Sequence, residues 1–464
     1  MNLSFFLLLI VLLPGCAFAT LGLTWLFGME MSERLVARLT ATCYSLVTLV
    51  AGGLWAAMFV QGQSSVTTSL GDWFEIGDYH YQLVLMVDRL SMPLVALSVV
   101  LVGLVGIFSV RYLHRDAGFY RFFLLLHLFG FGILLLFTAG SFDLLIGGWE
   151  LVGLTSVLLI AFFQHRNEPV TSALRVFATY RACDIGLLVA VVLMHHLAGS
   201  TTYATLFPAG WPNGGGVIAG SSATILGVLL LVASLGKAAQ VPFSGWLPRA
   251  MEGPTPSSAV FYGALSVHAG AYLLLRAEPI LKASPGVALA VVVVGILTAI
   301  HATMVGRACS DAKTSLAYAS MAQLGVIFVE IGCGWSWLAI FHITGHAVVR
   351  TLQFLRAPSM LHDFHQVHAA AGGHLGKTGA HYEQLFPEYI QTWLYRLALD
   401  RGHHDTVLDR YVVAPLLALA NQLYRLEEGW SVMAFGPTGE YREWLITKVG
   451  LLSLQKKEED ISVH

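Results

Sequence analysis

Apolar runs of about twenty residues recur along most of this 464-residue chain, and a helix of that length spans the roughly 30 Å hydrocarbon core of a bilayer. Only 12% of the residues are charged, whereas soluble domains average about 25%. We therefore predict an all-α, polytopic membrane protein of about eleven transmembrane helices. The predicted spans cover residues 2–28, 36–61, 89–112, 119–139, 141–164, 169–198, 218–240, 254–280, 285–307, 311–333 and 334–357.

Other classes find little support in the sequence. The stretch from Phe5 to Cys16 resembles a signal peptide, but it lacks a positively charged start and its apolar run continues to Phe27, so we interpret it as the first span. The net charge of −2 gives no reason to expect nucleic acid, and the five cysteines form no CxxC pair. We therefore expect no metal or redox cofactor in this chain.

The loops between the spans indicate the orientation of the chain. Lys and Arg gather in alternate loops, with Arg276 and Lys282 as exceptions. By the positive-inside rule, the N-terminus lies outside the cell inner membrane and the C-terminal tail is cytoplasmic. The aromatic segment 70–88, broken by Gly77 and Asp78, predicts a small external hairpin.

The organisation predicted is a transmembrane proton-channel domain over 1–357 and a cytoplasmic tail over 358–464. Within the tail, residues 408–426 favour an amphipathic helix at the membrane interface. Its apolar face, together with nearby aromatics, predicts contact with lipid and with a large soluble partner. Five histidines of the tail could bind zinc or could simply belong to a polar docking loop. They are His362, His365, His368, His374 and His381.

Charged residues inside the spans are the candidates for function. An ionised side chain at the bilayer centre costs roughly 2.5–3.5 kcal/mol, so it should be paired or should line a wet path. Glu150 lies well inside one span, and Lys237 precedes Pro242, which should break its helix. If its carboxylate partner can approach or withdraw, Lys237 could exchange a proton near neutral pH. The alternative is a static Glu–Lys pair that only fixes helix packing.

Two further groups share this setting. Arg175, Arg181 and Asp184 lie in one span, and Arg181 and Asp184 are spaced to pair on one helix face, either within a charge chain or as local neutralisation. His268 is a lone intramembrane histidine, and relay and core interpretations are both open.

His342, His346 and Arg350 are spaced i, i+4, i+8 in AIFHITGHAVVRTLQF, which places them on one stripe of a helix. Imidazoles exchange protons near pH 7, so the stripe predicts a proton or water path. A metal site at His342 and His346 would need another ligand that the sequence does not show.

Three long motifs resemble the antiporter-like membrane subunits of respiratory complex I, Mrp cation/proton antiporters and DAB inorganic-carbon complexes. They are WELVGLTSVLLIAFF, GKAAQVPFSGWLPRAMEGPTPSSA, and DAKTSLAYASMAQLG followed by FHITGHAVVR. MVDRLS (Asp88), YRFF (Arg121) and YRACD (Arg181, Asp184) agree, and the resemblance covers about residues 70–375. It implies that Glu150 is the channel carboxylate, Lys237 the lysine of the discontinuous helix, and His342 and His346 the paired histidines.

The chain also departs from that family. Tyr262 stands where a histidine usually follows PTPxSA, and Arg350 stands where the complex I type has lysine. Arginine keeps its proton, so Arg350 can shape the field but cannot readily carry a proton. The chain turns polar after Arg356, so we expect a truncated second inverted repeat.

The stretch LQFLRAPSMLHDFHQ looks more like the DAB-type subunit. That resemblance implies a proton-translocating subunit that drives inorganic carbon accumulation with a soluble, zinc-containing partner. The alternatives are a complex I-like proton-pumping subunit and an Mrp-type antiporter subunit. Sodium in place of the proton stays open.

Overall fold

The computed structural model of the chain describes residues 3–29, 31–77, 79–212, 215–309, 311–357 and 387–435. Within these ranges, 11 helical segments are long and apolar enough to cross a membrane. They are α1 (Leu3–Leu26), α2 (Glu33–Val60), α3 (Ser91–Tyr112), α4 (Phe119–Thr138), α5 (Phe142–Ile160), α6 (Asn167–Ala198), α8 (Gly220–Lys237), the segment Thr255–Arg276, α13 (Pro285–Ala308), α14 (Ala312–Gly332) and α15 (Ser336–Arg356). These bounds follow the predicted spans closely, so the predicted all-α membrane fold is confirmed.

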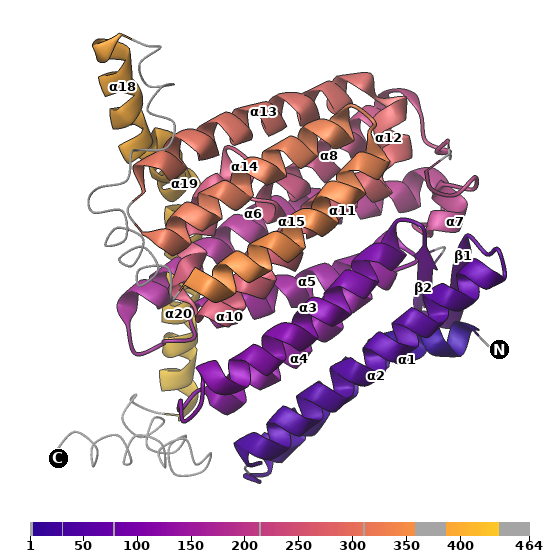
Figure 1. Cartoon of the computed structure of the whole chain (residues 1–464). Coiled ribbons are helices and arrows are strands. Elements are labelled where there is room, and N and C mark those ends of the chain that lie inside the picture. The colour runs from indigo at the N-terminus through magenta and orange to yellow at the C-terminus, as the bar shows by residue number, and fades with distance from the viewer. Residues whose placement is uncertain are drawn as a thin grey trace, which may run out of the picture. The chain divides into compact units, whose positions relative to one another are not determined.

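The segment Thr255–Arg276 lies in the interior of the helix bundle, where every one of its residues is buried. It consists of α10 (Thr255–Ser257), a π-helical turn η3 (Ser258–Leu265) and α11 (His268–Arg276). In Figure 1, α11 runs among α8, α14 and α15, and α1 and α2 form one flank of the bundle. A π-helix shifts the hydrogen bonds of the backbone and is often found at functional sites.

The predicted break after Lys237 is confirmed. The helix α8 ends at Lys237, and Ala239 takes a left-handed backbone conformation with φ of +51°. Irregular backbone at membrane depth must be bonded inside the protein. Here the N–H of Gln240 donates to the Leu235 carbonyl at 2.9 Å. Short helices then lead on to α10, namely η1 (Phe243–Gly245), α9 (Trp246–Arg249) and η2 (Ala250–Glu252).

The predicted hairpin is a pair of antiparallel strands, β1 (Ser65–Ile76) and β2 (Tyr79–Asp88). It begins at Ser65, before the predicted start at residue 70, because residues Ser65 to Ser69 pair with residues Asp88 to Val84. The N–H of Gly140, just before α5, donates to the Val84 carbonyl at 2.7 Å, so the hairpin is fixed to the end of a span.

The chain divides into two compact units, Met1–Thr406 and Val407–His464. The first unit therefore includes α18 (Glu388–Leu399), which lies in the predicted tail, and the functional division at 357–358 stays a prediction. In the second unit, α20 (Ala414–Phe435) covers most of the predicted amphipathic helix and exposes apolar side chains. Its position at the membrane interface stays a prediction. The predicted histidine-rich loop lies outside the described residues.

Candidate functional site

Four charged residues meet between three helices, and we call Glu150, Arg181, Asp184 and Lys237 the charge cluster. Arg181 of α6 donates from Nη2 both to Glu150 Oε2 of α5 and to Asp184 Oδ2, the latter at 2.7 Å. The pairing predicted for Arg181 and Asp184 is confirmed. The indole of Trp149 donates to the other oxygen of Asp184 at 2.6 Å, so both oxygens of Asp184 have partners. This arginine therefore bridges two carboxylates from adjacent helices.

Lys237 is held differently. Its side chain is buried, and Nζ donates to the main-chain carbonyl of Trp149 at 2.9 Å. The ammonium also lies 4.9 Å from the ring centre of Trp149 and 4.6 Å from that of Tyr180, which are distances of cation–π contacts. Because the ion partner of Glu150 is Arg181, the static Glu150–Lys237 pair that the sequence left open is not the arrangement observed.

Gly153 of α5 leaves the space that this ammonium occupies. A Cβ atom at position 153 would lie 3.0 Å from Lys237 Nζ and 3.6 Å from Tyr180 Cδ2. We expect Gly153→Ala to displace the ammonium and to lower the proton translocation that the sequence predicts by about tenfold, since small misplacements at a reacting group are costly. Transport by the protein reconstituted in vesicles is the measurement.

The matched control for that change is Gly147→Ala on the same helix, where the nearest atom to a new Cβ is 3.9 Å away. Alanine is more favourable than glycine inside a helix by roughly 0.5–1 kcal/mol, so neither substitution should destabilise α5. Equal transport by the two variants would show that the space at Gly153 is unimportant.

Three residues form a directed row of hydrogen bonds that we call the histidine chain: Arg350, His346 and His268. Nε of Arg350 faces Nε2 of His346 at 3.4 Å, and Nδ1 of His346 faces Nε2 of His268 at 3.0 Å. Nδ1 of His268 then meets the Ala264 carbonyl in the π-helical turn. Arginine can only donate, so each histidine accepts at Nε2 and donates from Nδ1. Two residues of the predicted stripe on α15, His346 and Arg350, are thus linked, and His268 joins them, whereas the proton or water path stays a prediction.

His342, the first residue of the predicted stripe, faces α14. Its Nδ1 lies 2.8 Å from Glu330 Oε1, and its Nε2 lies 3.0 Å from Gln323 Oε1. The ring centres of His342 and His346 are 6.4 Å apart. Glu330 is not among the predicted site residues, although an acidic residue inside the apolar run VIFVEIG is a signal of the same kind as Glu150.

A second acid that is not among the predicted site residues, Asp143, lies at the start of α5. It accepts hydrogen bonds from Thr201 at 2.6 Å and Tyr79 at 3.2 Å, and it pairs with His195 of α6 at 2.9 Å. Burial, reinforced by the charge of Asp143, raises the pKa of the Tyr79 hydroxyl to about 12. Tyr79 therefore stays a donor at every physiological pH. These contacts tie the hairpin to the ends of α5 and α6, beyond the charge cluster.

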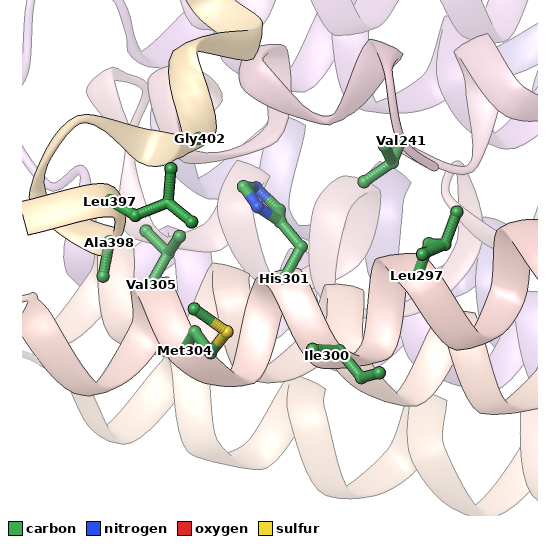
Figure 2. A pocket seen from close by; sticks show the side chains of 9 residues that line it. All are labelled: Val241, Leu297, Ile300, His301, Met304, Val305, Leu397, Ala398 and Gly402. Atoms are coloured by element: carbon green, nitrogen blue, oxygen red, sulfur yellow. The ribbon is translucent and has the colours of Figure 1, made fainter. Parts of the chain in front are cut away.

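Beside the break after α8 is a cavity of about 300 Å³. Figure 2 shows His301 projecting from α13 among mostly apolar side chains. Val241 is its only lining residue from the broken segment. Arg175, the remaining predicted site residue, has a half-buried side chain nearer the N-terminal end of α6 than Arg181.

The fold and these clusters define a class: a polytopic membrane protein with charged and titratable side chains inside its bundle. The profile described as NADH:quinone oxidoreductase/Mrp antiporter, TM, matches residues 139–374, and that described as NADH-Ubiquinone oxidoreductase (complex I), chain 5 N-terminus, matches 73–123. The chain belongs to this NADH:quinone oxidoreductase/Mrp antiporter family, as its motifs predicted.

Named relatives agree. The chain is 32% identical to NADH-ubiquinone oxidoreductase chain 5 of Allomyces macrogynus over 77% of this chain and 55% of the relative. It is 37% identical to NADH-quinone oxidoreductase subunit L of Mycobacterium tuberculosis over 63% of this chain and 46% of the relative. The chain thus spans about half the length of these curated relatives.

Solved structures give the same fold. The Mrp complex from Dietzia sp. DQ12-45-1b matches 74% of this chain and 37% of its own chain, with TM-score 0.62 and 28% identity. The archaeal membrane-bound sulfane sulfur reductase matches 75% of this chain and 70% of its own, with TM-score 0.63 and 20% identity, a likeness of fold alone. These relatives favour the complex I and Mrp alternatives over the predicted carbon role.

Proposed function

We propose that this chain is a proton-conducting, antiporter-like subunit of a membrane complex of the complex I and Mrp kind. The observation that carries the proposal is the charge cluster, in which a buried lysine at a helix break lies beside two carboxylates bridged by an arginine. Such groups are expensive at membrane depth and mark ion paths. The chain itself would hold no redox cofactor, and the chemistry that drives or uses the protons would belong to partner subunits.

The charge cluster contains one cation that keeps its proton and one that can exchange it. Arg181 keeps its proton and is bound to two carboxylates, so it sets the local field. Lys237 is bound only to a carbonyl and to aromatic faces. A neutral amine can still donate to that carbonyl, although more weakly than an ammonium, so loss of the proton breaks no salt bridge of Lys237. Lys237 is therefore the group that exchanges protons, and the histidine chain continues the path.

Glu150→Gln tests this division. The amide keeps the shape but removes one of the two negative charges on Arg181, leaving the cluster one charge more positive. We expect proton transport to fall by roughly a hundredfold or more, the range for loss of a group that serves proton transfer. Collapse of a pH gradient in vesicles that contain the complete complex is the measurement.

Glu168→Gln, an exposed acid at the start of α6, is the control and should transport normally. Unchanged transport by Glu150→Gln would remove the charge cluster from the mechanism and with it the proposal.

The proposed setting is the cell inner membrane, with the N-terminus outside and the C-terminus cytoplasmic. A large soluble cytoplasmic subunit is proposed because α20 exposes Leu419, Leu423 and Trp430, apolar area that lipid or a protein should cover. The relatives named above as subunits of multisubunit complexes support partners in general.

Inorganic-carbon accumulation is the second candidate. It is favoured by Tyr262 and Arg350, which depart from the complex I pattern, and by LQFLRAPSMLHDFHQ. Isolation of the native complex distinguishes the two candidates. A zinc-containing soluble partner that hydrates CO2 would establish the carbon role, whereas NADH-oxidising or other antiporter subunits would establish the first.

A further inference from the structure

Glu330 lies near the C-terminal end of α14 and belongs to none of the motifs that resemble the family. Its side chain is buried, with only 7% of the residue exposed. One oxygen, Oε1, faces His342 Nδ1 at 2.8 Å, and the other has no hydrogen-bond partner among the described residues. We call Glu330, His342 and Gln323 the Glu330 site.

The hydrogen bonds that His342 can make depend on how many protons His342 and Glu330 hold together. A neutral imidazole donates from one nitrogen only, yet His342 faces an oxygen at each of its two nitrogens. Both contacts are hydrogen bonds only if the imidazole is doubly protonated beside a carboxylate, or singly protonated beside a carboxylic acid. These two arrangements contain the same number of protons. The arrangement with the Gln323 oxygen toward His342 is therefore that of the pair with its extra proton bound and no net charge.

The proton-free pair can be accommodated without moving the backbone. When one proton leaves, His342 still donates from Nδ1 to Glu330, and its Nε2 becomes an acceptor. The amide of Gln323 has both an oxygen and an NH2 group, so a half-turn presents a donor to that nitrogen. The site can thus be satisfied in both states, unlike the fixed pair of Arg181 with its carboxylates.

The position of the site suits exchange with water. Glu330 precedes the turn between α14 and α15, where Trp335 and Trp337 are exposed, and such tryptophans gather at membrane–water interfaces. Inward from His342 follow His346, His268 and Arg350, which are the titratable and charged groups on that side. On its other side α14 packs on α13, where the atoms nearest to Gly332 belong to Ala288 and Val292.

We propose that the Glu330 site binds one transported proton from the aqueous phase at the α14–α15 turn and passes it toward His346. Glu330 and His342 share the proton, and Gln323 turns its amide to match each state. Transfer needs no other reactant, because a proton enters from water and leaves to the next imidazole. This inference rests on the proposed proton path but adds a residue and an end point to it.

Glu330→Gln in the complete complex is the test. We expect transport to fall on the order of tenfold to a hundredfold. We also expect the remaining transport to lose the dependence on the pH of the compartment that faces the turn, a change that a packing defect would not produce. Glu330→Asp, which keeps the carboxylate, should recover part of both properties.

Glu278→Gln is the matched control. Glu278 is also buried, also has one oxygen paired, here with Lys282 at 2.8 Å, and also has a second oxygen without a partner among the described residues. Normal transport and pH dependence in Glu330→Gln, in a complex where Lys237→Met is inactive, would overturn this inference alone. Normal transport in Lys237→Met as well would overturn the proposed function.

Discussion

Lys237→Ala is expected to lower proton transport by roughly a hundredfold or more, because it removes the exchangeable charge between Trp149 and Tyr180. Lys237→Arg is the sharper variant. A guanidinium keeps the positive charge but does not release its proton, so this variant should be inactive as well. Gradient collapse in vesicles containing the complex is the measurement, with assembly checked by size-exclusion chromatography.

Lys282→Arg makes the same chemical change at an exposed side chain of α12 (Glu278–Ala283) and should leave transport intact. Two results would count against the role given to Lys237. Transport by Lys237→Arg near the normal rate would mean that a fixed charge suffices at this position. Failure of the complex to assemble with Lys237→Ala, but not with Lys237→Met, would point to packing rather than proton exchange.

Asp88→Asn is expected to destabilise the protein by roughly 3–5 kcal/mol. Both oxygens of Asp88 accept from Arg276, at 2.6 and 3.0 Å, and both residues are buried. The asparagine would leave the guanidinium without a counter-charge. Burial opposes ionisation of Asp88, but Arg276 outweighs it, so the pKa of Asp88 lies below its usual value. The stabilisation is therefore present above the usual pKa and is lost only as pH falls through the lowered one.

Thermal or denaturant unfolding of the purified protein at pH 7 measures this loss. The control, Asp72→Asn, removes an exposed acid of the hairpin whose partner His80 lies 3.5 Å away, and it should cost less than about 1 kcal/mol. Replacing Asp88 and Arg276 together, as Asp88→Asn with Arg276→Met, should be milder than Asp88→Asn alone. A double variant that is less stable than the single one would contradict the ion-pair explanation.

Contacts within one helix were predictable from spacing. The stripe of His342, His346 and Arg350 and the Arg181–Asp184 pair follow from the repeat of an α-helix, and Pro242 announced the break after α8. The spans themselves followed from the length of the apolar runs, since the bilayer fixes how long a spanning helix must be.

Contacts between helices were not predictable, because spacing gives the face of a helix but not its neighbour. His268 and His346 are 78 residues apart in sequence, and only the packing of the segment Thr255–Arg276, chiefly η3, against α15 brings them together. Likewise, Glu150 could have paired with Lys237 or with Arg181, and the face that α6 turns toward α5 places Arg181 beside it. Glu330, like Glu150, could have been predicted as an acidic residue inside an apolar run. Its partner His342 could not, because it lies on the neighbouring helix α15.

The direction of the histidine chain limits how it can be used. Every bond in it points from Arg350 toward the Ala264 carbonyl, and a carbonyl is too weak a base to take the proton onward. A proton that hops from His346 to His268 therefore stays on His268 until a ring turns or the proton hops back. Each such hop also leaves His346 with its proton on the opposite nitrogen, so the rings must be reset before the next cycle. On the proposed path, His268 would therefore act as a store for one positive charge, and its filling or emptying would change the electric field inside the bundle.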